Sequence, residues 1–459
     1  MNQIPTPPAL EKPSVFQQFF AWLKHPIDIA PLVYFRIVGG ALMTIELTGG
    51  MFTSYIKNLL HPGFHFSYML FPWIKPWSEP WMMYLHFCLN VVLGVMVVFG
   101  AYYRIATLLL CLSATSIFLM EKALYINHIY LYCLMVFLLS LLPANRAFSY
   151  DVKRGKVKEV SEVPAWTVYI LAFQIAVVYF FAGIAKLNSD WLYAQPLKIW
   201  FASKGDHPVL GWLLVKEWYP YLVAYGGLFF DLFVVPFMLW KKTRKATFWI
   251  ACFFHATNAL TFGIGTFPWF SAAATLLFFP ADSFRNWKWL NKHLPAKGTA
   301  AFQFDSANRM VYPIVISYLI IQLAMPFRQF WYEGNTSWFD EGHNFSWHMM
   351  LRSKSGRAFF FVKDGVTGKE EKVSPTKYLN RKQYGRMIGK PDMLLEFAHF
   401  IRDEYVKKGW QEVSVSAYCK VSLNGRDSQI MLDRNVVLTE QERGLHHYDW
   451  VKPLTMPIK

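Results

Sequence analysis

The sequence has little of what marks a soluble enzyme or a disulfide-rich secreted protein. Only 17% of its 459 residues are charged, whereas soluble domains average about a quarter. It has five cysteines. Cys88, Cys111, Cys133 and Cys252 lie inside apolar runs, and only Cys419 lies in a polar region. No Cys-x-x-Cys or Cys/His ligand spacing occurs, which disfavours a disulfide framework and a structural zinc site. We therefore expect no metal.

A removable leader and a nucleic-acid-binding surface are also not expected. The first apolar run begins near residue 29, has no small-residue cleavage pattern and is followed by many more. It therefore has the features of a span rather than of a signal peptide. The net charge is +16, but the Lys and Arg residues lie in short loops between apolar runs. There they set membrane topology rather than follow a phosphate backbone.

Long apolar runs dominate the first two thirds of the chain. More than half of all residues are hydrophobic (54%) and 18% are aromatic. A helix needs about 18 or more apolar residues to cross a bilayer. The candidate spans are residues 29–50, 79–99, 105–120, 127–143, 165–185, 220–240, 247–265, 267–281 and 309–326. The sequence thus predicts a mainly α, polytopic bundle of about nine transmembrane helices at 29–326, after an N-terminal cytoplasmic segment at 1–28.

Residues 327–459 are as polar as an ordinary soluble domain. Alternating runs at 357–363 and 412–419 predict strands, and 390–407 predicts a helix. Asp364-Gly365 marks a hairpin turn. We therefore expect a C-terminal α+β domain.

The distribution of loop charge predicts the orientation in the membrane. One set of loops contains Lys24, Arg104, and the basic stretches 146–158, 241–245 and 285–309, while the opposite loops hold only scattered lysines. Cytoplasmic loops carry the excess of Lys and Arg. The N-terminus is therefore predicted in the cytoplasm and the C-terminal domain outside, in the periplasm or the lumen.

Several ionisable or amide side chains fall within or at the ends of the predicted spans, where such groups are costly and therefore functional candidates. They are Arg36, Glu46, Asn127, His128, Lys186, Asp231, His255 and Asn258. Each also has a structural interpretation. Arg36 and Glu46 are too far apart to pair with each other but could each meet another helix, and Asp231 follows a Gly-Gly pair where helices approach closely. Lys186 could extend to the interface.

The predicted topology places His128 and Lys186 at the same membrane face, with His255 about halfway along its span. Burial favours the neutral amine of a lysine, which could then act as a base near neutral pH. A histidine, an amide and an amine under the C-terminal domain are consistent with an active site, and the structural interpretation remains open beside this one.

Phe181-Ala-Gly-Ile-Ala-Lys-Leu-Asn-Ser-Asp-Trp191 resembles the segment that carries the catalytic base of vitamin K-dependent gamma-glutamyl carboxylases. The resemblance continues, in order, along nearly the whole chain. The further similar stretches are 25–31, 62–66, Asn127-His128 with Tyr130-Leu-Tyr132, Phe254-His-Ala-Thr-Asn258 with Gly263-Ile-Gly-Thr-Phe267, and Ser346-Trp-His-Met-Met350 with Arg352-Ser-Lys354.

This resemblance implies that vitamin K hydroquinone, a menaquinol if the protein is bacterial, is deprotonated by an uncharged Lys186. The quinol anion then reacts with O₂ to give a strong base that removes a γ-proton from a glutamate of a peptide or protein substrate. CO₂ adds to the carbanion and the epoxide leaves. By the same resemblance Asn127 and His128 are catalytic. The implied lining of the quinone and glutamate pocket is His255, Asn258, Phe267, Trp347, Met349, Met350 and Arg352.

The chain departs from the animal members of that family in three respects. It stops at residue 459, it has Ala185-Lys186 where they have two lysines, and its cysteines do not supply their disulfide between membrane and lumenal parts. These departures favour a bacterial inner-membrane protein over one of the endoplasmic reticulum, working on the quinone pool of the bilayer. Two alternatives remain open: a quinol-oxygenating enzyme with another substrate, and a transporter or sensor. No repeat between the two halves supports a transporter.

Overall fold

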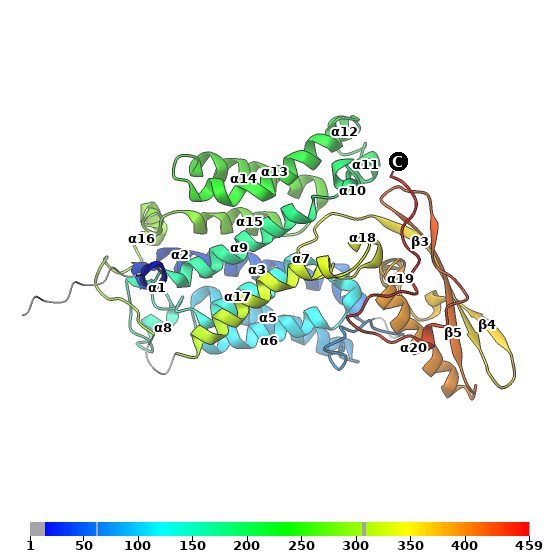
Figure 1. Ribbon diagram of the computed structural model, residues 1–459. Helices are drawn as coiled ribbons and strands as arrows, with labels where there is room; N and C mark the ends of the chain where they lie inside the picture. Colours follow the sequence, from blue (N-terminus) through cyan, green and yellow to red (C-terminus); the bar gives the residue numbers. More distant parts are fainter. Residues whose placement is uncertain (1–13, 61–62, 305–308, 459) are drawn as a thin grey trace, which may run out of the picture.

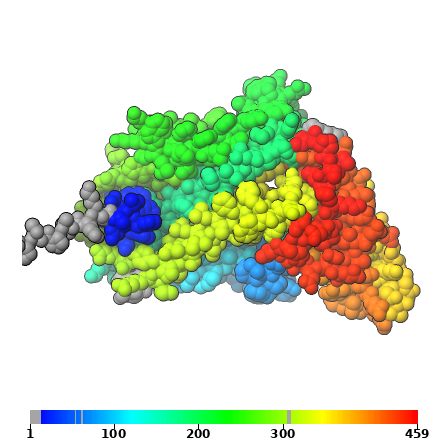
Figure 2. All heavy atoms as spheres, viewed as in Figure 1, coloured from blue at the N-terminus to red at the C-terminus, as the bar shows by residue number. Residues whose placement is uncertain are grey.

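The structure, a computed structural model, describes residues 14–60, 63–304 and 309–458. A bundle of long helices makes up most of it, and a smaller unit built on a four-stranded sheet covers one end of the bundle (Figures 1 and 2). We call this end the domain end and the opposite one the far end. Residues 1–13 of the predicted N-terminal segment, and Pro62 of the similar stretch 62–66, lie outside the described residues.

Each predicted span coincides with helical structure in the described part of the chain. These helices are α2 (Ala30–Tyr34) with η1 (Phe35–Gly39) and α3 (Gly40–Phe52), α5 (Pro80–Phe99), α6 (Tyr103–Leu119), α7 (Asn127–Leu141), α9 (Trp166–Ala185), α13 (Tyr219–Leu239), α14 (Arg244–Phe262), α15 (Phe267–Ala274) with η3 (Thr275–Phe278), and α17 (Val311–Phe327).

Among the described residues, five of these helical segments are long and apolar enough to cross a membrane: Ala30–Phe52, Pro80–Phe99, Trp166–Ala185, Tyr219–Leu239 and Val311–Trp331. The apolar segments Tyr103–Leu119, Asn127–Leu141 and Phe267–Phe278 are shorter. A polytopic membrane protein is therefore confirmed, whereas the count of nine spans stays a prediction. At a rise of about 1.5 Å per residue, a helix needs about 20 residues to cross the hydrocarbon core.

Shorter elements close the two ends of the bundle. They are α1 (Val15–Lys24), β1 (Pro26–Asp28), α4 (Ser54–Leu59), α8 (Tyr150–Lys153), β2 (Glu162–Pro164), α10 (Ser189–Leu192), α11 (Leu197–Ala202), α12 (Gly211–Leu214), α16 (Lys288–Asn291) and α18 (Thr336–Phe339).

Several of the basic loops are tied together at the far end. Strands β1 and β2 pair there, and Arg285 Nε donates to Asp28 at 2.8 Å. Arg36 lies in the π-helical turn η1 and is fully buried. Its guanidinium donates to the carbonyls of Ala144 (2.7 Å) and Ala147 (3.1 Å). The structural interpretation of Arg36 fits this geometry, because carbonyls beyond the end of α7 have no partner within that helix.

The C-terminal unit is an antiparallel sheet in the order β4-β3-β5-β6 with helices against it. Its strands are β3 (Lys354–Lys363), β4 (Glu370–Val373), β5 (Ser414–Leu423) and β6 (Gln429–Leu432), and its helices are α19 (Arg381–Met387) and α20 (Pro391–Lys407). The predicted strands, the helix and the hairpin at Asp364-Gly365 are confirmed, since β3 and β4 pair on either side of that turn. One face of β3 and β5 is buried at every second residue, as period-2 patterning requires.

Loops of the bundle complete the core of the C-terminal unit. Phe66 is fully buried in that core with Phe360 and Phe397. Gly63 lies so close to the backbone of Tyr378 that a Cβ at this position would meet the carbonyl oxygen at 2.1 Å. The two parts therefore share one packed interface rather than a flexible connection.

Buried charges fasten the same interface at two places. Arg426, in the turn between β5 and β6, donates from Nη1 to Asp190 of α10 at 2.8 Å and also from Nη2. Both side chains are 5% exposed. At the second place, Asp392 of α20 pairs with Lys122 of the bundle and with Arg443 (2.5 Å). We call these the Asp190 and Asp392 contacts.

We predict that Asp190→Ala destabilises the protein by about 3–5 kcal/mol, because it leaves the buried Arg426 unpaired. Thermal unfolding of the purified protein in detergent measures the loss. As a control, Glu370→Ala breaks the exposed pair between Glu370 and Arg434 and should cost less than about 1 kcal/mol. Equal effects of the two substitutions would contradict a buried, stabilising contact.

Candidate active site

A cavity with a volume of about 740 Å³ lies inside the bundle. Most of its lining is apolar and comes from α3, α5, α6 and α7. Phe87 and Val97, both in the lining, are ten residues apart on α5, which corresponds to about 15 Å along the helix axis. The cavity is therefore elongated. Its polar lining includes Glu46, Asn127 and His128.

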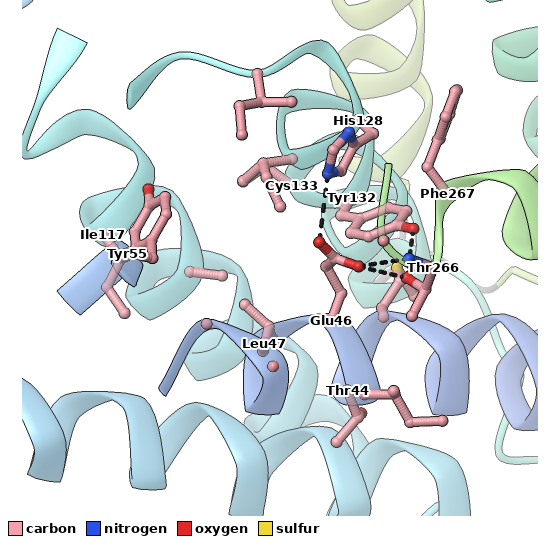
Figure 3. Close-up of a pocket in the computed structure, with 18 of the residues that line it drawn as sticks. Thr44, Glu46, Leu47, Tyr55, Ile117, His128, Tyr132, Cys133, Thr266 and Phe267 are labelled. Atoms are coloured by element: carbon pink, nitrogen blue, oxygen red, sulfur yellow. Dashed lines mark hydrogen bonds and ion pairs between the residues drawn. The ribbon is translucent and has the colours of Figure 1, made fainter. Parts of the chain in front are cut away.

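His128 is held from two sides in this cavity (Figure 3). Its Nε2 lies 3.4 Å from Oε1 of Glu46, and its ring stacks on Phe267 with centroids 5.5 Å apart. Glu46 in turn accepts hydrogen bonds from the backbone N–H (2.7 Å) and the hydroxyl (2.8 Å) of Thr266. Gly265 has a φ of +61°, and a Cβ at this residue would lie 2.6 Å from the Glu46 carboxylate. The Gly-Ile-Gly-Thr loop therefore fixes Glu46, and Glu46 orients His128.

Asn127 connects the same cavity to the loop that follows α18. Its side-chain N–H donates to the carbonyl of His348 at 3.0 Å, and its oxygen accepts from the Tyr125 hydroxyl at 2.8 Å. The pKa of His348 is lowered to about 3 by burial, so this imidazole is neutral at physiological pH. Trp347 and Met350 of the loop have φ of 60°. A left-handed backbone conformation is strained for residues other than glycine. It occurs where surrounding contacts hold it in place, often at functional sites.

A second cavity of about 110 Å³ contains Lys186, His255 and Asn258. The Nζ of Lys186 lies 2.5 Å from Oδ2 of Asp231, and both side chains are 7% exposed. Nζ is also 5.2 Å from the centre of the Trp191 ring. His255 Nε2 lies 2.7 Å from the Tyr179 hydroxyl. Lys186 therefore does not extend to the interface as a lone lysine would. It forms a buried pair.

The two cavities share four lining residues, Ile264, Phe267, Met349 and Met350. Sequence reasoning selected three of these four, and the structure places them between the His128 cavity and the Lys186 cavity. Trp347 and Arg352 line neither cavity. Trp347 is 1% exposed and stacks on Tyr130 with centroids 5.1 Å apart.

Arg352 pairs with Asp340. Lys390 lies 3.7 Å from the same carboxylate, and the pKa of Asp340 is well below its usual range because these cations outweigh burial. The pKa of Lys390 is lowered to about 7, mainly by burial. Arg352 therefore supports the loop before β3 rather than a cavity wall.

Two partners were not recognised from the sequence. The sequence predicts helix packing for Asp231, yet Asp231 pairs with Lys186, and it predicts a structural role for Glu46 without indicating the partner. Their partners are 45 and 82 residues away in the chain, so no local pattern connects them. The only available signal was their ionisable character within apolar runs.

The geometry defines a polytopic membrane protein with paired titratable groups beside two cavities that share part of their lining. Family comparisons agree. Residues 24–283 match the HTTM domain, and residues 307–457 match the lumenal domain of vitamin K-dependent gamma-carboxylase. The chain belongs to the vitamin K-dependent gamma-carboxylase family. No solved structure matches it significantly.

We predict that Lys186→Met and Asp231→Leu each cost about 3–5 kcal/mol of stability, because each leaves the partner charge buried alone. The double substitution should cost less than either single one, since it leaves no unpaired charge. Thermal unfolding of all four proteins in detergent gives the coupling energy. Additive losses would contradict a direct Lys186–Asp231 interaction.

Proposed function

We propose that the chain uses reduced vitamin K, O₂ and CO₂ to carboxylate the γ-carbon of glutamate in a peptide or protein, with coupled epoxidation of the quinol. The observation that carries this proposal is the meeting of two cavities, one with His128 and Glu46 and one with Lys186 and Asp231, at Phe267, Met349 and Met350. Family membership supports it.

The cavities fit a lipid-soluble quinol, a menaquinol if the protein is bacterial. The larger cavity is elongated and mostly apolar, and its volume falls in the usual range for small-molecule sites, about 300–1,000 Å³. Its polar side chains could position a ring hydroxyl while the apolar walls of α3, α5 and α6 hold an isoprenoid tail. When bound, the quinol supplies the oxidisable ring whose reaction with O₂ yields a base stronger than any side chain.

Lys186 is proposed to receive the proton of a quinol hydroxyl. Nζ can accept it by passing one of its own protons to Oδ2 of Asp231, so the transfer leaves an ammonium beside a neutral carboxyl. After the transfer, Asp231 and the face of the Trp191 ring hold the new ammonium. His255 and Asn258 line the same cavity and are proposed to orient the quinol.

In the larger cavity, His128 and Asn127 are proposed to bind and orient the reacting glutamate and the quinol ring. The carboxylate of Glu46 fixes the orientation of the His128 ring, and the His348 carbonyl fixes that of Asn127. A strong base survives only where water is excluded. The loop through Met349 and Met350, which lines both cavities, is proposed to exclude it.

We predict that purified protein given reduced vitamin K, bicarbonate and a short glutamate-containing peptide forms both the epoxide and carboxylated glutamate. Lys186→Ala should lose both products by at least about 100-fold, as expected for a group that transfers a proton. Glu46→Gln keeps the size of the side chain but removes its charge, and should lower kcat by about 10-fold with a smaller change in KM. Mass spectrometry of the epoxide and of the carboxylated peptide measures both products for each variant.

Lys198→Ala serves as the control in this assay, since Lys198 bonds to the Tyr221 hydroxyl and lines neither cavity. It should leave both products unchanged. Epoxide without carboxylated glutamate would indicate a quinol-oxygenating enzyme with another substrate. Neither product from the parent protein, with Lys186→Ala identical to it, would exclude both enzymatic functions and leave the transporter or sensor.

We also propose that the N-terminus is cytoplasmic and that the C-terminal unit lies outside, in the periplasm if the protein is in a bacterial inner membrane. Lys369→Cys, at the turn between β3 and β4, should then react with a membrane-impermeant thiol reagent in intact cells. Lys241→Cys, between α13 and α14, should react only after permeabilisation. The reverse pattern would overturn the orientation.

A further inference from the structure

Two cations of the C-terminal unit line the larger cavity. Lys382 and Arg386 belong to α19 and are the only basic residues in the described part of its lining. They are four residues apart, so they lie on one face of the helix. Arg386 is exposed and Lys382 is half-buried. The cavity that contains His128 is therefore also lined by a cationic helix face.

No carboxylate among the described residues forms an ion pair with Lys382 or Arg386. Among the described residues, neither side chain has an ion pair or a side-chain hydrogen bond, although most buried cations in the same unit have one. The pKa of Arg386 is below its usual value, because desolvation and the nearby Arg352 outweigh the opposite effect of Asp340. Like charges four residues apart destabilise a helix. An arrangement of this kind is stabilised when an anion binds between the two charges.

Helix α19 is held rigidly in place. Asn380 and Gln383 form a capping box at its start. The Gln383 side chain also donates to the carbonyl of Phe64 (2.7 Å) and to Glu121 (2.8 Å), both in loops of the bundle. Gln383 and Met387 form the buried face of α19. Lys382 and Arg386 lie on a different face, which lines the cavity. The cations are thus positioned by contacts that cross the interface between the two parts of the protein.

We infer that Lys382 and Arg386 form a carboxylate-binding site that recognises the side chain of the substrate glutamate at the domain end of the larger cavity. This inference rests on the proposed function and adds to it the residues that select the substrate. Arg386 has the planar donor set that matches a carboxylate bidentately, and Lys382 adds a point charge. A glutamine has the same shape without the charge and is therefore rejected.

Binding of a short fluorescent glutamate-containing peptide to the full-length protein in detergent, without quinol, tests the site independently of turnover. Arg386→Gln should weaken binding by about 10- to 100-fold, as for the loss of a hydrogen bond to a charged group. Lys382→Gln should weaken it less. Arg381→Gln, on the same helix and exposed like Arg386 but outside the cavity lining, is the matched control and should bind like the parent.

Two further measurements identify the ligand. The peptide with glutamine in place of glutamate should bind the parent weakly and be insensitive to Arg386→Gln. In nanodiscs, phosphatidylglycerol in place of phosphatidylcholine should leave peptide binding unchanged. Equal binding of both peptides, or full affinity in Arg386→Gln, overturns the site. Loss of peptide binding in phosphatidylglycerol also overturns it, because the cations would then hold a lipid phosphate.

These outcomes are distinguishable from failure of the proposed function. Arg386-dependent binding of the glutamate peptide without any carboxylated product would overturn the proposed function and leave the carboxylate site. Carboxylation by a protein in which Arg386→Gln leaves the KM for the peptide unchanged would overturn the site alone. The expected result is a raised KM for the peptide and an unchanged KM for the quinol.

Discussion

The arrangement of the candidate site depends on the buried charges that join the C-terminal unit to the helix bundle. Asp190 with Arg426, and Asp392 with Lys122 and Arg443, take their charges out of water. Removing either partner of such a pair is far costlier than the pair itself is stabilising. The main effect of these contacts is therefore to fix the position of the sheet over the bundle. The resemblance to animal carboxylases assigns a comparable role to a disulfide, whereas all five cysteines here are free.

That placement brings two segments of the C-terminal half over the cavities. The loop that contains His348, Met349 and Met350 lies between the cavities, and its His348 carbonyl orients Asn127. Helix α19 contributes Lys382 and Arg386 to the lining of the larger cavity. None of these contacts lies within the bundle alone. The C-terminal unit is therefore a structural part of the site, which explains why a bundle with so many apolar helices carries a unit of this size.

The sequence was sufficient where a physical rule acts locally. Apolar length located the helices, alternation located β3 and β5, and the cost of a charge in hydrocarbon singled out Glu46, Lys186 and Asp231. It was insufficient where the partner is remote. The contact between Glu46 and Thr266 joins residues 220 positions apart, and no periodicity encodes it. Trp347 and Arg352 show the same limit. They belong to a stretch that resembles the carboxylase family, but they line neither cavity and instead hold the loop in place. Trp347 stacks on Tyr130 and Arg352 pairs with Asp340.

Under the proposed function, the pairing of Lys186 with Asp231 and of His128 with Glu46 is what the place of the chemistry requires. A base stronger than any side chain requires a site without water, and an isolated charge in such a site is costly. The Lys186 ammonium has the Asp231 carboxylate as its immediate partner there, and the Glu46 carboxylate faces His128 in the same way. A substrate carboxylate meets the same restriction. It can enter an apolar cavity only where fixed cations replace its water, and in the described lining of the larger cavity those cations come from α19. Under the proposed function, an apolar quinol needs no such replacement, so the bilayer would supply one reactant to the bundle while the C-terminal unit would receive the other from water.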